Sequence, residues 1–337
     1  MAPNGPSQSD FSETHEMVDP SEGMLLTTSE VAGLLAVHTS TVKRWTAEGH
    51  LVSYKTEGGH RRIHLNHVLA AARERGIPTF LDAFHPWEAN VWLAVHQASR
   101  RQDFRRVHSL SLSWLSQGET DLMGHLLFEV GRRPDIPFTR FLDCGIRGLM
   151  ARVGEEWMGG RLQVGEEHMA TQVVLEALVR LRPGWDRLGF HSGAGSDPPP
   201  VAVVGAMEGD QHELGAQSVR ILLEREGWRV YYLGADVPVE EFASIQVAQV
   251  ACLVCISFSP RNTLPDLQRA LRVLGEFYRP GYPYALALGG SLPEIDPKQL
   301  GDGPFQGLLV SGSVEELSAW TRSLRNPDEA LGSRRPA

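Results

Sequence analysis

Three residues in the stretch GDQHELGAQSV (209–219) have the types and the spacing of a metal-binding loop. Imidazole is a good ligand for transition metals, and His212 supplies one. Asp210 stands two residues earlier, where its carboxylate can accept the second ring N–H, fix the tautomer and raise the basicity of the imidazole. Gly215 stands three residues later and lets a bulky group come close to the following helix. The alternative is a solvated surface histidine, which is the usual role of a lone histidine in a loop.

The elements around this loop predict a doubly wound α/β domain. The apolar run VAVVGAM precedes the loop, and four more runs follow at helix-length intervals, namely WRVYYLGA, ACLVCISF, YALALGG and GLLVSG. Such alternation is the signature of a parallel sheet covered by helices. Ligands of these sheets bind beyond the carboxyl ends of the strands, at the topological switch point. The loop that holds His212 follows the first strand, so we expect the site at that edge.

Composition narrows the class of protein. The 337 residues carry a formal charge of −9, so the charge of the chain as a whole does not favour nucleic-acid binding. The three cysteines indicate a reduced compartment without disulfides. Cys252 and Cys255 are expected to be core thiols on opposite faces of a strand, because their separation is odd. No run approaches about 18 apolar residues, and the polar N-terminal head lacks the apolar region of a signal peptide. We therefore expect a cytoplasmic protein without a membrane span.

A small basic unit stands out near the N-terminus. Residues 27–76 hold seven Lys and Arg against four Glu, a net charge of +3. They predict a helix-turn-helix, with Thr28 or Ser29 as the cap of the first helix, Thr39 or Ser40 as the cap of the second, and the second helix in the major groove of DNA. The segment VSYKTEGGHRRIHL then predicts a β-hairpin whose basic side chains meet phosphate oxygens. The expected DNA-binding residues are Thr39, Thr41, Lys43, Arg44, Tyr54, His60, Arg61 and Arg62.

This basic unit resembles the winged-helix DNA-binding domain of the MerR regulator family, and TEGGHRRI is similar to the wing of that family. The resemblance implies that the chain binds a paired promoter site as an oligomer. One such module makes few phosphate contacts and binds weakly, so tight binding needs several modules together.

The D-x-H-x-x-G loop resembles the cobalamin-binding domain of methionine synthase and of corrinoid proteins. The resemblance implies that His212 is the lower axial ligand of cobalt, in place of the cofactor's own dimethylbenzimidazole. Asp210 is then the hydrogen-bond partner of that histidine, and Gly215 is the position of close contact. The residues implied to contact the tail of the cofactor are Ser257, Gly289 and Gly290. Ser259 stands where the family has a leucine, a departure that affects only that contact.

The helical stretch before this domain holds a further motif, in EEWMGGRLQVGEEHMATQ. From the residues alone, Trp157 is more often a core aromatic, and Glu167 with His168 fits a capping acid beside a solvated histidine. The spacing W-x9-E-H, between a MerR-like head and a cobalamin domain, resembles the CarH/CarA/LitR group of adenosylcobalamin-dependent repressors. That resemblance implies that Trp157 packs beside the adenosyl group and that Glu167 and His168 line the same upper cavity.

Met158 departs from the pattern of this group. Light-sensing members have at this position a histidine that ligates cobalt once light has cleaved the cobalt–carbon bond. We expect Met158 at the cofactor, where a thioether is a poorer ligand for Co(III) than imidazole. The usual photoproduct, with a histidine on each side of the metal, is therefore not expected to form in the usual way.

The sequence predicts a multidomain protein of α and α/β units. The expected segments are a disordered tail (1–24), a MerR-type winged-helix DNA-binding domain (25–76), a four-helix bundle that caps cobalamin (80–190), a linker (191–200), a flavodoxin-like, Rossmann-related cobalamin-binding domain (201–325) and a tail (326–337).

The function implied by the resemblance is that of a transcriptional regulator without enzymatic activity. It would repress promoters as a homo-oligomer, a dimer or tetramer, under the control of adenosylcobalamin and of light. One alternative is a light-independent cobalamin or corrinoid sensor. Another is a corrinoid methyl-transfer or mutase subunit, which would need a catalytic domain such as a TIM barrel, for which the sequence shows no segment. A third is a degenerate cobalamin domain, which the intact Asp210, His212 and Gly215 disfavour.

Overall fold

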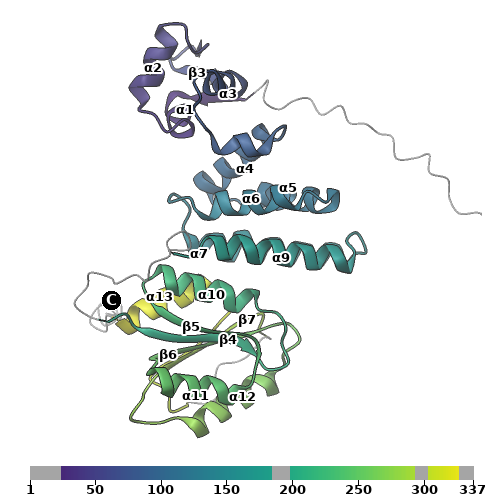
Figure 1. Ribbon diagram of the computed structural model, residues 1–337, viewed down its shortest axis with the longest axis vertical. Coiled ribbons are helices and arrows are strands. Elements are labelled where there is room, and N and C mark those ends of the chain that lie inside the picture. The colour runs from purple at the N-terminus through teal and green to yellow at the C-terminus, as the bar shows by residue number, and fades with distance from the viewer. Residues whose placement is uncertain (1–23, 184–197, 293–302, 326–337) are drawn as a thin grey trace, which may run out of the picture. The chain divides into compact units, whose positions relative to one another are not determined.

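The computed structural model describes residues 24–183, 198–292 and 303–325 (Figure 1). Most of the predicted N-terminal tail (1–24), most of the predicted linker (191–200) and the predicted C-terminal tail (326–337) lie outside the described residues. The chain forms two compact units, residues 1–93 and 94–337, and each is described by itself.

The first unit contains the predicted helix-turn-helix and hairpin. Its elements are β1 (Leu25–Thr27), α1 (Thr28–Leu34), α2 (Thr39–Ala47), β2 (Tyr54–Lys55), β3 (Arg61–His64), α3 (Leu65–Glu74) and the 3-10 helix η1 (Phe80–Phe84). The strands are antiparallel in the order β1-β3-β2, so the short β1, which the sequence analysis did not predict, completes the hairpin. Val31, Val42 and Ile63 are fully buried and join both helices to the sheet.

The predicted helix caps are wrong, because each helix is capped one residue earlier. Thr27 caps α1: its Oγ1 accepts from the N–H of Glu30 at 3.2 Å, while Glu30 Oε2 accepts from the N–H of Thr27 at 2.7 Å. This reciprocal pair is a capping box, whose T-x-x-E signature is present in the sequence. His38 caps α2 through Nδ1, which accepts from the N–H of Ser40 at 3.2 Å. Imidazole is an unusual cap, so residue type alone favoured Thr39 or Ser40.

The second unit begins with a helical bundle. Its elements are α5 (Arg105–Gln117), α6 (Thr120–Gly131), α7 (Phe138–Arg140), the π-helical turn η2 (Phe141–Ile146), α8 (Arg147–Met158) and α9 (Val164–Arg180), and α4 (Glu88–Arg101) runs across the boundary between the units. Helices α5, α6, α8 and α9 pack against one another as a four-helix bundle. Trp114, Leu126, Leu149 and Val174, one from each helix, are completely buried, as expected for the apolar stripe of an amphipathic helix.

The α/β domain follows the bundle in the same unit. Its strands are β4 (Val201–Met207), β5 (Arg229–Val237), β6 (Leu253–Phe258), β7 (Ala285–Gly290) and β8 (Leu308–Ser311), and its helices are α10 (Leu214–Arg225), α11 (Val239–Gln249), α12 (Leu264–Phe277) and α13 (Val314–Arg325). The five strands are parallel in the order β5-β4-β6-β7-β8. This is the flavodoxin-like order, with its switch point beside β4. Helices α10 and α13 cover one face and α11 and α12 the other (Figure 1). The predicted fold class is confirmed.

The two cysteines of the C-x-x-C have different environments. Cys255 is buried in β6, and burial raises the pKa of its thiol, so its predicted place in the core is confirmed. Cys252 precedes the strand and is exposed, so the prediction of a core thiol is wrong there. The described residues contain no helix long and apolar enough to cross a membrane.

Candidate functional site

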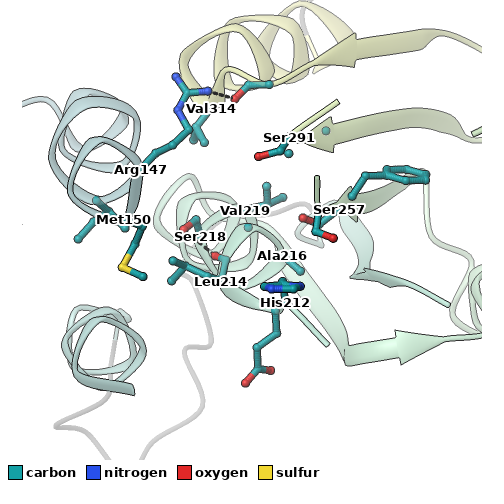
Figure 2. Close-up of a pocket in the computed structure, with 18 of the residues that line it drawn as sticks. Arg147, Met150, His212, Leu214, Ala216, Ser218, Val219, Ser257, Ser291 and Val314 are labelled. Carbon is teal, nitrogen blue, oxygen red and sulfur yellow. Dashed lines mark hydrogen bonds between the residues drawn. The ribbon is translucent and has the colours of Figure 1, made fainter. Parts of the chain in front are cut away.

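A large pocket lies within the second unit, between the bundle and the carboxyl ends of the strands. Its volume is about 1170 Å³. Figure 2 shows Arg147 and Met150 reaching into this region from α8, with His212 and Ser257 on the side of the sheet. Pockets for drug-sized ligands range from about 300 to 1000 Å³, so this one has room for a larger group.

His212 and Asp210 form a dyad at the edge of this pocket. The ring Nδ1 of His212 lies 2.8 Å from Asp210 Oδ1, and the backbone N–H of His212 donates to the same oxygen at 2.9 Å. The carboxylate is 1% exposed, whereas the imidazole is 54% exposed and lines the pocket. With Nδ1–H donated to Asp210, the lone pair of Nε2 is available to a metal. The predicted pair is therefore brought together in the geometry of a ligand and its supporting carboxylate.

The next residue, Glu213, is also held in place. Its Oε2 accepts a hydrogen bond from the hydroxyl of Tyr232 on β5 at 3.0 Å. Burial of Tyr232, together with the negative charge of Glu213, raises the pKa of that phenol, so the hydroxyl remains a donor well above neutral pH. This hydrogen bond connects the start of α10, which follows His212 in the chain, to β5.

Gly215 and Ser257 form a narrow slot beside the dyad. A Cβ atom at position 215 would collide with Ser257 Oγ, so only glycine leaves both the helix and the serine where they are. Ser257 is buried near the end of β6 and lines the pocket together with Gly215. A slot of this kind accepts an extended group between α10 and the strands.

Gly289 and Gly290 end β7 next to this slot. Gly290 has φ +100°, and a Cβ there would overlap the carbonyl oxygen of Phe258, while a Cβ at position 289 would lie 3.0 Å from the carbonyl oxygen of Ser311. Both glycines and the partly polar segment Ser257–Ser259 line the pocket. The dyad, the slot and the glycine cradle together fit a metal-centred cofactor that has an extended tail.

The bundle supplies the opposite wall of the pocket. Trp157 is 46% exposed and lines the pocket, so the interpretation as a core aromatic, which its residue type alone favoured, is wrong. His168 and Glu167 also line it, with His168 Nδ1 at 2.7 Å from Glu167 Oε2, and Thr171 Oγ1 donates to the other carboxylate oxygen at 3.2 Å. The three residues of the W-x9-E-H motif therefore meet at one cavity.

Met158 does not join them. Met158 is 75% exposed and is not among the residues that line the pocket. The wall of the pocket at the end of α8 is therefore formed by Trp157 and not by Met158. The predicted contact of Met158 with the cofactor stays a prediction.

Met150 and Gly154 were missed by the sequence analysis. They lie seven and three residues before Trp157 and line the pocket with it. That spacing places all three on one face of α8, and this is a signal that the sequence did contain. A Cβ at Gly154 would have no heavy atom within 4 Å, so the glycine leaves open space on the pocket side of the helix.

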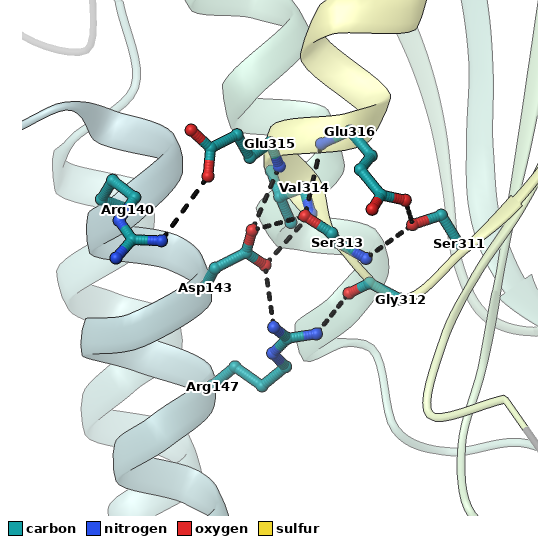
Figure 3. A network of polar contacts seen from close by, with 9 residues as sticks. All are labelled: Arg140, Asp143, Arg147, Ser311, Gly312, Ser313, Val314, Glu315 and Glu316. Carbon is teal, nitrogen blue, oxygen red and sulfur yellow. Dashed lines mark hydrogen bonds and ion pairs between the residues drawn. The ribbon is translucent and has the colours of Figure 1, made fainter.

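Asp143 and Arg147 were also missed, and they join the bundle to α13 (Figure 3). Asp143 accepts hydrogen bonds from Ser313 Oγ at 3.0 Å and from the backbone N–H groups of Val314 and Glu315, both at 3.1 Å. Arg147 lies 3.4 Å from the same carboxylate and donates to the carbonyl oxygen of Gly312 at 2.5 Å. Asp143 and Arg147 line the pocket, so this joint forms part of its wall.

The basic residues of the first unit lie along α2 and the hairpin. Lys43, Arg44, Tyr54 and His60 are exposed, and Thr39, Thr41, Arg61 and Arg62 are half-buried. Arg61 is paired with Lys55, and Arg62 with Tyr54, in the register of β2 and β3. Within residues 24–93 none of the Lys and Arg of this set forms an ion pair with a carboxylate. Their charges are available to an anionic partner.

Comparison with known families matches three parts of the chain. Residues 25–76 match a helix-turn-helix domain, residues 116–182 match a B12 binding domain, and residues 200–307 match a second model described as a B12 binding domain. The two B12-binding matches cover most of the described bundle and sheet that enclose the pocket.

Curated proteins similar to this chain include regulators and corrinoid proteins. The HTH-type transcriptional repressor CarA of Myxococcus xanthus is 25% identical over 309 residues, which are 90% of this chain and 98% of that protein. The HTH-type transcriptional repressor CarH of Myxococcus xanthus is 28% identical over 44% of this chain and 46% of that protein. Dimethylamine corrinoid protein 1 of Methanosarcina acetivorans is 28% identical over 41% of this chain and 62% of that protein. With a helix-turn-helix domain, two B12-binding domains and similarity to CarA along 90% of its length, the chain has the domain organisation of a cobalamin-binding helix-turn-helix regulator.

Proposed function

We propose that this protein is a transcriptional repressor that binds adenosylcobalamin in the pocket between bundle and sheet and binds promoter DNA through its helix-turn-helix. The observation that carries the proposal is the Asp210–His212 dyad, which places an available imidazole at the mouth of a cavity of about 1170 Å³. Cobalamin would supply a cobalt centre there. His212 would ligate the cobalt, and its tautomer would be held by the buried carboxylate of Asp210.

The remaining predicted residues have separate roles in this proposal. Ser257, Gly289 and Gly290 would hold the tail of the cofactor in the slot beside Gly215, where added side-chain atoms have no room. Trp157 would pack on the adenosyl group, and Glu167 with His168 would meet its polar edge. Aromatic and hydrogen-bonding groups on the bundle would favour the adenosyl form, because an adenosyl group offers a base for Trp157 to pack on and polar atoms for Glu167 and His168.

Control of DNA binding is proposed to work through oligomerisation. A single helix-turn-helix with few phosphate contacts binds weakly, and several linked modules bind far more tightly. Adenosylcobalamin can shift this equilibrium only if it binds one oligomeric state better than the other. The wall of the pocket built from α8 and α9 makes the bundle the part of the chain that senses the cofactor.

Light is proposed to act by removing the adenosyl group, and a light-independent sensor is the second candidate. One observation favours the second candidate: Met158, at the position of the usual photoproduct histidine, is exposed and does not line the pocket. Residue 158 would then supply no ligand to the cobalt. A corrinoid methyl-transfer subunit is disfavoured, because residues 25–76 form a helix-turn-helix.

The proposal is tested by adding adenosylcobalamin in darkness to the full chain and to His212→Ala. We expect the wild type to retain the cofactor through gel filtration, to change its mass in solution, and to show a visible spectrum that His212→Ala alters. His50→Ala is the matched control, because His50 is a similarly exposed histidine near a carboxylate but belongs to the other unit and is not among the residues that line this pocket. A bound cofactor whose spectrum ignores His212→Ala would contradict the ligand assignment. A mass unchanged by green light would leave cobalamin sensing in place and remove light sensing.

A further inference from the structure

Asp236 contacts each of the three residues that precede His212. Its Oδ1 accepts from the backbone N–H of Gly209 at 2.7 Å, and its Oδ2 accepts from the side-chain amide of Gln211 at 3.0 Å. Its backbone N–H donates to the carbonyl oxygen of Asp210 at 2.9 Å. The loop that carries the dyad is thus attached to β5 through one residue.

The backbone at Asp236 is unusual. Its φ is +55°, in the left-handed region, where a residue other than glycine is uncommon and costs free energy. Aspartate tolerates this region better than most residues. Its side chain is exposed, so burial does not explain why the conformation is kept. The contacts with Gly209 and Gln211 do, because the left-handed backbone directs the carboxylate toward the loop.

On the side of β5, regular strand pairing does not reach this loop, whereas β4 stays in register with β6 as far as Ala206. Strands β4 and β5 pair in regular register only up to Val204, and the register shifts between Val204 and Gly205 and again between Gly205 and Met207. Regular ladder hydrogen bonds therefore end before the loop begins. Asp236 lies in the part of β5 where the register with β4 has shifted. Its three hydrogen bonds connect the loop to β5 where regular ladder hydrogen bonds are missing.

The dyad is rigid internally but depends on this attachment. Asp210 Oδ1 accepts from both the backbone N–H and the ring of His212, so the two residues move as one body. The position of that body relative to the slot of Gly215 and Ser257 is set by the residues on either side. Tyr232 holds Glu213 on the helix side, and Asp236 holds Gly209, Asp210 and Gln211 on the strand side.

We propose that Asp236 is a positioning residue for His212, which sets where the imidazole meets the metal of the cofactor and so decides whether His212 or the cofactor's own base is the lower ligand. The proposal rests on the proposed function, since it assumes cobalamin in this pocket. Asp236 would not contact the cofactor itself. It would act through residues 209–211.

The test compares Asp236→Gly with Asp236→Asn. Glycine adopts φ +55° without strain but removes both acceptors, whereas asparagine keeps an acceptor for Gly209 and tolerates the left-handed region. Val250→Gly is the matched control, because Val250 is an exposed residue with φ +51° at the end of α11 and contacts nothing in the loop. Each full-length variant is prepared with ¹⁵N-histidine, titrated with hydroxocobalamin, and reduced to the Co(II) form for EPR spectroscopy.

In the wild type we expect the cobalt signal to be split into doublets by one ¹⁵N nucleus, which identifies a histidine of the protein as the lower ligand. In Asp236→Gly we expect part of the signal to show the triplets of ¹⁴N, from the cofactor's own base, and about 5- to 25-fold weaker binding, as for one or two lost hydrogen bonds. Asp236→Asn and Val250→Gly should keep the doublets and bind within about 3-fold of the wild type, and the cofactor-free glycine variants should melt within about 4 °C of it.

Doublets and wild-type affinity in Asp236→Gly would overturn the positioning role. A large loss of thermal stability in that variant, in step with its affinity, would also overturn it, because Asp236 would then be a structural residue. Absence of ¹⁵N doublets in the wild type itself would overturn the proposed role of His212 and this inference together, so the two failures are distinguishable.

Discussion

The carboxylate of Asp143, in the bundle, caps the helix that begins at Val314, 171 residues later in the chain, through a hydrogen bond of 3.1 Å to the N–H of Val314 (Figure 3). The first N–H groups of a helix have no partner within it, and an anion there is also favoured by the helix dipole. Ser313 Oγ accepts from the N–H of Glu316 at 3.3 Å and is a local cap of the same helix. Asp143 adds the cap that connects this helix of the α/β domain to the bundle. This joint is a wall of the pocket and holds its two sides together.

Asp143→Ala is expected to destabilise the cofactor-free protein by about 2–4 kcal/mol. The substitution leaves two backbone N–H groups and the Ser313 hydroxyl without their acceptor, and it leaves Arg147 without its carboxylate. The measurement is urea unfolding followed by circular dichroism. Asp266→Ala is the control: Asp266 is half-buried and completes the local capping box of α12 with Thr263, so about 1 kcal/mol is expected there. Equal losses in the two variants would show that the joint adds nothing beyond an ordinary cap.

Gly215→Ala is expected to weaken cobalamin binding at least about 10-fold while the fold is retained, because the new methyl group occupies the position of Ser257 Oγ. Equilibrium titration followed in the visible spectrum measures the effect. Adding Ser257→Gly to Gly215→Ala should restore part of the affinity, since it reopens the slot.

Gly165→Ala serves as the control for that experiment. Position 165 is in α9, a Cβ there meets nothing within 4 Å, and the residue does not line the large pocket. The substitution should leave affinity unchanged and stabilise the protein by about 0.5–1 kcal/mol. If Gly215→Ala behaves in the same way, the slot is not used by the ligand.

The stability of the cofactor-free protein is expected to fall below pH 6.5, in part because of His108. Burial lowers the pKa of His108 below its ordinary 6.5, although its Nε2–H donates to the carbonyl oxygens of Cys144 and Gly145 in the π-helical turn, both at 3.0 Å. The unfolded chain therefore takes up the proton first as the pH falls. The stability that neutral His108 contributes is complete above pH 6.5 and is lost as the pH falls from 6.5 through the pKa of His108 in the folded protein.

Unfolding free energies of the wild type and of His108→Gln across this pH range isolate the effect. Glutamine keeps an N–H donor but has no proton to gain. The unfolding free energy of the wild type minus that of His108→Gln should be constant above pH 6.5. Below pH 6.5 this difference should fall, because only the wild type loses stability through His108. Parallel curves would exclude His108 as a source of the acid sensitivity.

Lys43→Ala and Arg61→Ala are each expected to weaken binding to a random-sequence duplex and to lower the slope of log affinity against log salt by about 1. Both charges lie on the surface of α2 and the hairpin without an ion pair to any carboxylate in residues 24–93. Arg73→Ala is the control, because Arg73 is already paired with Glu88 at 3.1 Å. A slope that changes equally in all three variants would show that net charge, and not this surface, governs binding.

Local features of this protein were determined by the sequence. The dyad joins residues two apart, the hairpin turns around Gly58 and Gly59, and strand and helix alternate along residues 201–325. Contacts of this kind depend on backbone geometry within a few residues, so the order of residue types specifies them. The type of fold and the pairing of Asp210 with His212 could be predicted for the same reason.

The tertiary structure decided which residues meet across long distances in the chain. No spacing indicates that Asp143 caps α13 or that Asp236 holds the loop 27 residues before it, because such pairs form only when separate elements pack. Packing also fixes the rotation of α8 about its axis, and residues on that helix point about 100° apart. Trp157 and Met150 line the pocket and Met158 does not, an outcome that the sequence of α8 alone left open.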